Sequence, residues 1–250
     1  QFSKITLDPV KQTIKREGIP TVINPLDRHA VEEALRLREK YSGTITALSM
    51  GPPQATEVLQ DALAMGVDNA VLLSDSAFAG SDTLATVYPL AAAIEKIGTF
   101  DLILCGNESV DGATQQVGPQ LAELLNIPHC TYVKRIIDLT EDCMKLHRSI
   151  EQGYLEIDIQ LPALITVVKE INEYRLPTVM AIMEVTGKDI ATWNSNDIGV
   201  EKNKTGLNGS PTTVAGVFER KSERKRNIIT GAPRDIAAQV VKELRKLEAV

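Results

Sequence analysis

Four short segments of this chain combine Gly or Pro with small polar side chains, and each stands next to the start of a helical pattern. They are INPLD (23–27), SMGPPQ (49–54), SDSAFAGSDTLAT (74–86) and CGNESVDGATQQVGP (105–119). A helix N-terminus presents unpaired backbone N–H groups and a partial positive charge, so phosphate is its natural ligand. Together the four segments predict a nucleotide site.

The glycines and acids of these segments indicate how a nucleotide would be held. Glycine lets the backbone approach an anion closely, and the candidates are Gly80, Gly106, Gly112 and Gly118. Asp82 and Asp111 would repel phosphate but could face ribose hydroxyls. The alternative is that Ser81, Asp82 and Thr114 only cap helices. No segment matches GxGxxG or GxxxxGKS, so this is neither a standard dinucleotide fingerprint nor a P-loop.

Catalytic and metal-binding patterns are missing from the sequence. There is no GxSxG elbow, the histidines lack HxxxH or HExxH spacing, and the cysteines form neither a CxxC pair nor a disulfide framework. These residues are His29, His129, His147, Cys105, Cys130 and Cys143. We therefore expect no metal, and we expect a cofactor to carry any chemistry.

Composition excludes several classes of protein. The net charge is −6, from 27 basic and 33 acidic residues, and aromatic residues make up 4%. Neither value favours nucleic-acid binding. No apolar run reaches the roughly 18 residues of a membrane span, and no signal peptide is visible. We expect a cytoplasmic protein with reduced thiols and no membrane insertion.

The order of elements explains how the four segments could meet. Apolar strands are predicted at 44–51, 70–75 and 100–106, and amphipathic helices at 28–41, 53–66, 81–98 and 117–126. This alternation predicts an α/β fold, a doubly wound parallel sheet of the Rossmann-like, adenine-nucleotide-binding kind. In such sheets ligands bind beyond the carboxyl ends of the strands, where these segments fall.

The second half of the chain follows another pattern. Strands at 130–139, 143–150 and 154–161 predict a small antiparallel meander, and a buried strand at 163–169 could rejoin the main sheet. Residues 184–212 predict an extended arm, followed by a helix at 236–247. We expect a nucleotide-binding domain over 1–183 and a C-terminal arm with its helix over 184–250. A doubly wound fold normally begins with an apolar strand, so we expect one to precede Gln1.

Nearly the whole chain resembles the beta subunit of electron-transfer flavoproteins, most closely the electron-bifurcating type that binds FAD and NAD. The similar segments are REGIPTVINPLDRHAVEEALRLREKY, ALSMGPPQATEVLQDALAMGVDNAVLLSD, AFAGSDTLAT, DLILCGNESVDGATQQVGPQLAE and EQGYLEIDIQLPALITVVKEINEYRLPTVMAIM. The resemblance implies a heterodimer whose alpha subunit holds one FAD in a mobile domain. The beta subunit helps to build a second site, which holds AMP in simple members and an FAD that exchanges hydride with NAD(H) in bifurcating members. The stretch LSDSAFAGSDTLAT (73–86) is similar to the bifurcating type.

Position by position, the resemblance implies a cofactor site drawn from all four segments. The residues are Asn24, Pro25, Asp27, Met50, Gly51, Asp75, Ala77, Phe78, Gly80, Asp82, Thr83, Thr86, Cys105, Gly106, Asp111, Gly112, Thr114, Gln115, Gln116, Val117 and Gly118. The last seven match the family's loop for adenine, ribose and phosphate.

The stretch NEYRLPTVMAIM (172–183) is similar to the family's partner-recognition loop, with an apolar anchor at Val179 and with Arg175, Leu176 and Met180 nearby. The alternative is that these are core residues of a connecting segment. Many members continue with a lysine-rich run, whereas this chain reads EVTGKDIATW (184–193). The partner dehydrogenase, of acyl-CoA or lactate type, is therefore left open.

The resemblance implies one leading function. The chain would be the electron-transfer subunit of a flavoprotein oxidoreductase complex in anaerobic metabolism, passing single electrons to the alpha-subunit FAD and a partner flavin dehydrogenase by bifurcation or confurcation. One alternative is a simple electron carrier with AMP in this site. Another, from a different class, is an adenine-nucleotide-binding sensor or hydrolase.

Overall fold

The computed structural model describes residues 6–7, 14–15, 21–213 and 228–246. The chain forms two compact units, Gln1–Thr213 and Val214–Val250. The described part of the second unit contains α7 (Pro233–Lys246), which is the helix predicted near residues 236–247. No helix in the part of the chain that the structure describes is long and apolar enough to cross a membrane.

A three-stranded parallel sheet forms one part of the first unit. Its strands are β3 (Thr46–Met50), β4 (Asn69–Leu73) and β10 (Ala191–Trp193), in the order β10-β4-β3. β3 and β4 were expected from their apolar runs. β10 was not, because a strand of three residues is too short to show alternation.

A five-stranded mixed sheet forms the other part. It contains β5 (Leu102–Gly106), β9 (Ala163–Val167), β6 (His129–Leu139), β7 (Cys143–Ile150) and β8 (Gly153–Gln160), in that order. β5, β9 and β6 run parallel, while β6, β7 and β8 form an antiparallel meander. The predicted meander and the predicted return of the chain to the sheet are both confirmed.

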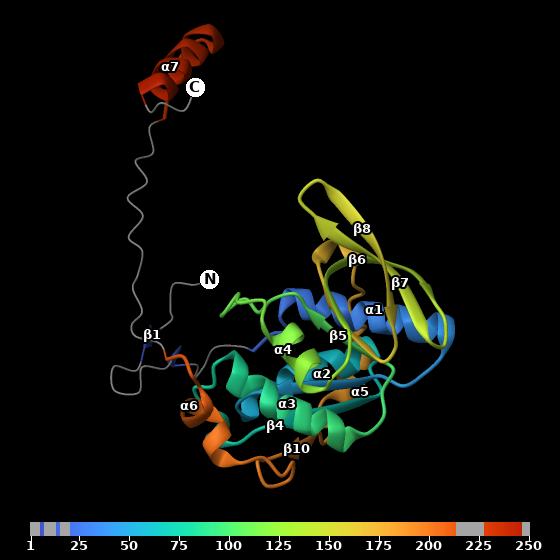
Figure 1. Ribbon diagram of the computed structural model, residues 1–250. Coiled ribbons are helices and arrows are strands. Elements are labelled where there is room, and N and C mark those ends of the chain that lie inside the picture. Colours follow the sequence, from blue (N-terminus) through green and yellow to red (C-terminus); the bar gives the residue numbers. More distant parts are fainter. Residues whose placement is uncertain (1–5, 8–13, 16–20, 214–227, 247–250) are drawn as a thin grey trace. The chain divides into compact units, whose positions relative to one another are not determined.

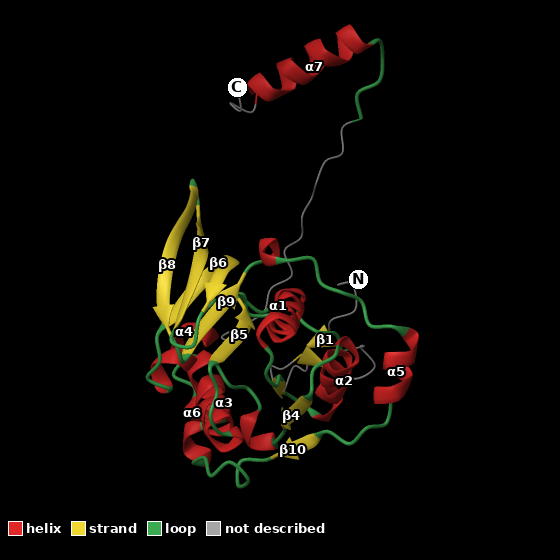
Figure 2. Ribbon diagram, turned by 90° about the vertical axis from the view of Figure 1, so that its right-hand side faces the viewer, coloured by secondary structure: helices red, strands yellow, loops and turns green. Residues whose placement is uncertain are grey.

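Helices cover both faces of the parallel strands, as Figures 1 and 2 show. They are α1 (Pro25–Tyr41), α2 (Thr56–Met65), α3 (Thr83–Ile97) and α4 (Val117–Leu124). α2 ends at Gly66, whose φ of +118° is a left-handed conformation that glycine adopts without strain. The doubly wound class predicted from the sequence is confirmed.

Alternate strand residues face opposite helices. Ala47 of β3 packs with the apolar residues of α1 and α2, whereas its neighbour Leu48 packs with those of α3 and α4. In β9, Ile165 packs against Ala30 of α1, and Leu164 packs against Leu121 of α4. The period of two along each strand therefore gives two apolar layers.

The parallel strands form two hydrogen-bonded sheets rather than the single sheet expected. Among the described residues no ladder joins β3 to β5. The two sheets nevertheless share a core, since Leu48 of β3 and Ile103 of β5 pack against the same α3–α4 cluster. The strand expected before Gln1 stays a prediction. A two-residue ladder also pairs β1 (Thr6–Leu7) with β2 (Ile14–Lys15).

The segment expected to be an extended arm (184–212) is part of the first unit and packs within it. α5 (Val179–Val185) precedes β10, and α6 (Gly206–Gly209) follows it. A Cβ on Gly206 would lie 2.3 Å from the Ala77 carbonyl oxygen, so α6 lies directly against the loop after β4. The expected domain division at residue 183 stays a prediction; along the chain, the first compact unit ends at Thr213 and the second begins at Val214.

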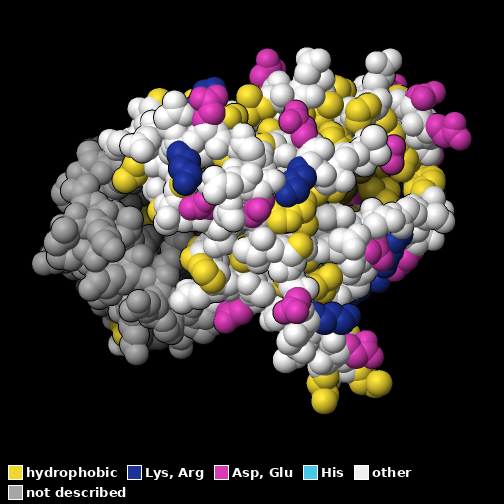
Figure 3. All heavy atoms as spheres, turned by 90° about the horizontal axis from the view of Figure 1, so that it is seen from below, with side chains coloured by type: hydrophobic (Ala, Val, Ile, Leu, Met, Phe, Trp, Pro, Cys, Tyr) yellow, Lys and Arg dark blue, Asp and Glu magenta, His cyan; other side chains and the backbone are white. Residues whose placement is uncertain are grey.

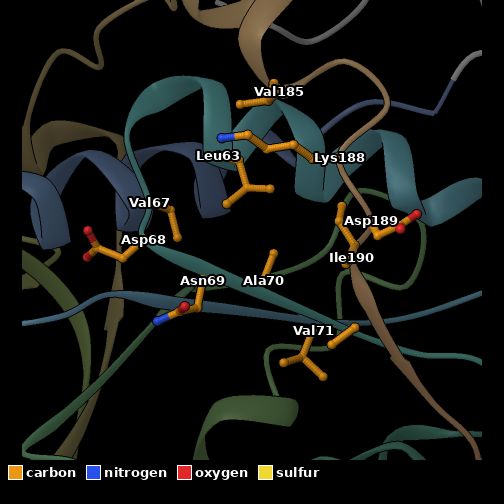
Figure 4. Close-up of a pocket in the computed structure, with 11 residues that line it drawn as sticks. Leu63, Val67, Asp68, Asn69, Ala70, Val71, Val185, Lys188, Asp189 and Ile190 are labelled. Carbon is orange, nitrogen blue, oxygen red and sulfur yellow. The ribbon is translucent and has the colours of Figure 1, made fainter.

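A hollow of about 430 Å³ lies at the amino edge of β4 and β10. Figure 4 shows side chains from α2, from β4 and from the chain between α5 and β10 around it. Its lining includes apolar Leu63, Val67 and Ile190 and the charged residues Lys188 and Asp189. Because ligands of doubly wound sheets bind at the carboxyl edge, this hollow is separate from the predicted nucleotide site.

Candidate functional site

The parallel strands bring the predicted segments to one edge. Met50 ends β3, Leu73 ends β4 and Gly106 ends β5. The Thr83 hydroxyl, at the start of α3, donates a hydrogen bond of 3.1 Å to Gln116 Oε1, at the start of α4. The starts of α3 and α4 are therefore neighbours, and the segments 74–86 and 105–119 meet there.

The start of α1 holds the loop that follows β5. Asp27 accepts a hydrogen bond of 2.6 Å from the Gly106 N–H and one of 2.9 Å from the Asn24 side-chain amide. The Asn24 amide also donates to the Glu108 carbonyl over 2.9 Å, and its oxygen accepts from the Val110 N–H over 3.2 Å. Asn24 and Asp27 therefore position the candidate nucleotide loop.

The loop over residues 109–116 is the exposed part of this edge, and every residue in it is exposed. Its backbone turns through left-handed conformations, with φ of +48° at Ala113 and +60° at Gln115. Gln116 is the N-cap of α4 but makes no side-chain capping bond. The first N–H groups of α4 therefore donate no hydrogen bond to the side chain of their own cap residue, which leaves this helix start suited to an anion.

Asp82 is bonded within the chain. Its carboxylate caps α3 by accepting from the Ala85 N–H over 3.0 Å, and it also accepts from the N–H and hydroxyl of Thr212 over 3.0 and 2.8 Å. Nearby, a Cβ on Gly80 would lie 2.6 Å from Leu207 of α6. The capping alternative is confirmed for Asp82, and its contact with a ribose stays a prediction.

Asp75 is bonded in the same manner. One of its oxygens accepts from the Ala77 N–H over 2.9 Å, and the other accepts from the N–H and hydroxyl of Ser195 over 3.0 and 2.6 Å. These hydrogen bonds, led by that from Ala77, lower the pKa of Asp75 to about 2. The carboxylate thus fastens the segment after β10 to the loop after β4.

Close packing accounts for two of the predicted glycines. A Cβ on Gly106 would lie 2.7 Å from Leu26 of α1, and one on Gly118 would lie 2.5 Å from Thr166 of β9. These glycines let a helix approach a strand. A Cβ on Gly112 would meet no atom nearer than 3.4 Å, so Gly112 is the glycine of this loop with room for a ligand.

Several other predicted residues contribute to packing. Phe78 is 7% exposed and packs with Met50 against β4 and α3. Burial, helped by nearby Asp27, raises the pKa of the Cys105 thiol to about 12, so this thiol stays protonated. The Gly51 N–H extends the ladder between β3 and β4.

The remaining predicted residues lie at the edge itself. Pro25 opens α1, Thr86 lies in the first turn of α3, Asp111 and Thr114 are exposed in the loop, and Val117 opens α4. Within the described ranges, no group of three or more His, Cys, Asp or Glu side chains is arranged to hold a metal ion.

The predicted recognition segment forms α5 and the chain before it, at the outer side of the first unit beside α2 (Figure 2). Leu176, Val179 and Met180 are 72%, 73% and 73% exposed, and Met183, which the sequence did not single out, is 71% exposed. They are not core residues of this unit. On the face in Figure 3, hydrophobic, acidic and basic side chains are interspersed.

Arg175 fixes the start of this segment to α1. Its Nε donates to Glu32 over 2.8 Å, and its Nη1 donates to Glu39 over 2.6 Å. Glu32 is 2% exposed. Burial alone would raise the pKa of Glu32, but hydrogen bonds from Arg175 and Arg36 lower it to about 2. The ion pair therefore persists at neutral pH.

Sequence analysis missed residues that reach the edge from distant segments. Asn107 and Thr166 form a buried pair, and Ser195 and Thr212 bind the two loop acids. Tyr132 reaches Gln115 from β6. The sequence pattern of a strand or of an aperiodic segment does not predict such contacts, because they depend on which distant elements the fold brings together.

The fold defines a doubly wound α/β protein whose helix starts lie at the carboxyl ends of its parallel strands. The electron transfer flavoprotein domain matches residues 12–198, and the chain belongs to this family. An electron transfer flavoprotein subunit beta from Thermoanaerobacterium thermosaccharolyticum is 42% identical over 249 residues, covering 99% of this chain and 95% of that protein.

Two other relatives have different names. The caffeyl-CoA reductase-Etf complex subunit CarD of Acetobacterium woodii is 42% identical over 246 residues, which is 98% of this chain and 94% of the relative. Protein FixA of Azorhizobium caulinodans is 41% identical over 258 residues, with coverage of 98% and 92%. The chain thus matches these proteins over nearly their whole lengths.

Gly106→Ala should destabilise the chain by about 1–3 kcal/mol, because the new methyl group overpacks the contact between α1 and β5. Gly112→Ala, in the open part of the same loop, should stay within about 0.5 kcal/mol of the wild type. Urea unfolding of both variants measures the difference. Equal effects would contradict the packing role of Gly106.

Asp75→Asn should lower the free energy of unfolding at pH 7 by about 1–2 kcal/mol, allowing for partial solvent exposure. The folded pKa of about 2 lies below the ordinary value of 3.8, so the contribution is present above pH 4 and lost as the pH falls towards 2. Urea unfolding at several pH values should show the wild type and the variant converging in that range. A gap independent of pH would refute the assignment.

Proposed function

We propose that this chain is the beta subunit of a heterodimeric electron-transfer flavoprotein and holds FAD at the carboxyl edge of its parallel strands. The observation that carries the proposal is the start of α4, where Gln116 makes no capping bond and the exposed loop 109–116 stands alongside. A nucleotide phosphate fits this position because the backbone N–H groups and the helix dipole both favour an anion.

The chain offers groups suited to each part of an adenine nucleotide. The first N–H groups of α4 would hold phosphate, and the exposed Asp111 and Thr114 would face ribose. The open space at Gly112 would let the ligand approach the backbone closely. When bound, FAD accepts a hydride from NADH and releases electrons singly. The residues of this chain would bind and orient the nucleotide and set its polar surroundings.

One observation favours AMP as a second candidate occupant. Leu207 lies over Gly80, and Thr212 binds Asp82, so this chain's own residues partly cover the loop on which the flavin half would rest. The loop over 109–116 is exposed and suffices for adenosine and one phosphate. With AMP, the protein would be a one-electron carrier without NADH reactivity.

The proposed assembly is a cytoplasmic heterodimer with an alpha subunit. The three cysteines are free thiols, as expected of a reducing compartment. The family and the subunit names of the relatives support a partner subunit. We also propose that the C-terminal helix α7 packs on the alpha subunit.

We propose that the recognition segment (172–183) binds a flavin-dependent dehydrogenase of the acyl-CoA or lactate type. Its exposed apolar side chains, Leu176, Val179 and Met180, suit insertion into a partner's pocket. The Arg175–Glu32 pair fixes the base of the segment before docking. The name of the Acetobacterium woodii relative, a caffeyl-CoA reductase complex subunit, favours the acyl-CoA type.

Nucleotide release from the purified heterodimer tests the cofactor. Two FAD per heterodimer and bleaching of the flavin by NADH are expected, whereas one FAD with one AMP would refute the bifurcating assignment.

Thr114→Ala should weaken nucleotide binding about five- to ten-fold through one lost hydrogen bond. Thr192→Ala, on exposed β10, is the matched control and should leave binding unchanged.

Val179→Asp should slow electron transfer to the partner dehydrogenase at least ten-fold, because a charge would occupy an apolar anchor position. Its nucleotide content should be unchanged. Val22→Asp is the control, since Val22 is 68% exposed and Val179 is 73% exposed. Equal electron-transfer rates in the two variants would show that α5 is not part of the docking surface.

A further inference from the structure

Tyr132 has an unusual backbone conformation for its residue type. Its φ is +59°, a left-handed value that bulky side chains rarely adopt. It sits where the register between β6 and β9 shifts, between Cys130 and Val133. Strained residues and bulges concentrate at functional positions, where they aim a side chain, so the direction of this tyrosine needs an explanation.

A buried hydrogen-bond chain holds the backbone of Tyr132 in place. Its N–H donates to Thr166 Oγ1 over 3.2 Å, and the Thr166 hydroxyl donates to Asn107 Oδ1 over 2.8 Å. Thr166 is 1% exposed and Asn107 is 6% exposed. The chain joins β6, β9 and the first residue after β5, so the bulge is tied directly to the candidate nucleotide loop.

The tyrosine side chain reaches the exposed part of that loop. Its hydroxyl donates a hydrogen bond to Gln115 Oε1, and Gln115 Nε2 donates to Glu108 Oε2 over 2.7 Å. Gln115 itself has a φ of +60°. The Glu108 carbonyl accepts from Asn24 at the start of α1. Tyr132 thus continues a brace that runs from β9 across the loop to α1.

This brace accounts for the open start of α4. Gln115 and Gln116 are the two residues before the helix, and an amide oxygen from either could turn towards its first N–H groups. The Gln115 oxygen is bonded to Tyr132, and the Gln116 oxygen is bonded to Thr83. Both amides are therefore held away from the helix start, where an anion would bind.

We propose that Tyr132 is a positioning residue of the nucleotide site. Its hydroxyl holds the Gln115 amide away from α4 and keeps the loop in its binding conformation before the nucleotide arrives. This inference rests on the proposed function, because it assumes that the start of α4 takes a phosphate. It predicts that the hydroxyl contributes to affinity without touching the ligand.

The experiment compares Tyr132→Phe and Gln115→Ala, singly and combined, in the full-length chain within its purified assembly. Hydrogen exchange of amides 109–116, measured after removal of nucleotide, should speed up in each single variant. The dissociation constants of FAD and AMP should rise about three- to ten-fold. The double variant should be no worse than Gln115→Ala alone, since Gln115→Ala already removes the bond to Tyr132 together with the bond to Glu108. The melting temperature should stay near that of the wild type.

Tyr154→Phe is the matched control, because Tyr154 lies on the meander and stacks on His147; it should change neither reading. Unchanged exchange and affinity in Tyr132→Phe, or additive effects in the double variant, would overturn the inference. A wild type that binds neither FAD nor AMP would instead overturn the proposed function, and the exchange measurement would still decide whether Tyr132 braces the loop.

Discussion

The contact between Asp27 and Gly106 is the one on which the site depends. The carboxylate at the start of α1 accepts the Gly106 N–H at the end of β5 over 2.6 Å, and only glycine lets helix and strand approach so closely. Burial raises the pKa of Asp27, whereas the hydrogen bonds from Gly106 and Asn24 act in the opposite direction. From this point the loop after β5 is directed outward, towards α4.

One rigid helix links the two proposed functional surfaces. The N-cap residue Asn24 and Asp27 in the first turn of α1 hold the candidate nucleotide loop, and later turns of the helix hold Arg175 through Glu32 and Glu39. A helix of 17 residues with a buried face keeps these two ends at a fixed separation. The rate of electron transfer between a cofactor and a docked partner depends on the distance between them. We therefore regard α1 as the element that sets the separation of the two proposed surfaces.

The loop after β4 is used differently. Its acids, Asp75 and Asp82, hold Ser195 and Thr212 from the returning chain. Carboxylates that suit a ribose also suit N–H and hydroxyl groups of the protein. The loop is thus stabilised by its own chain, and the exposed loop after β5 carries most of the proposed binding surface.

The sequence by itself determined the doubly wound class, the meander and the position of the four segments, because apolar periodicity and the direction of parallel strands are local or follow from strand order. It also indicated the caps and the glycines. Only the tertiary structure decided the role of each residue. Gly106 and Gly118 allow close helix packing, and Asp82 binds Thr212 of the returning chain. Tyr132 is aimed at the candidate nucleotide loop from a shift in the register of β6. These roles depend on partners 34 to 130 residues away in the sequence: Leu26 for Gly106, Thr166 for Gly118 and Tyr132, and Thr212 for Asp82. Residue spacing alone does not specify which distant side chains meet.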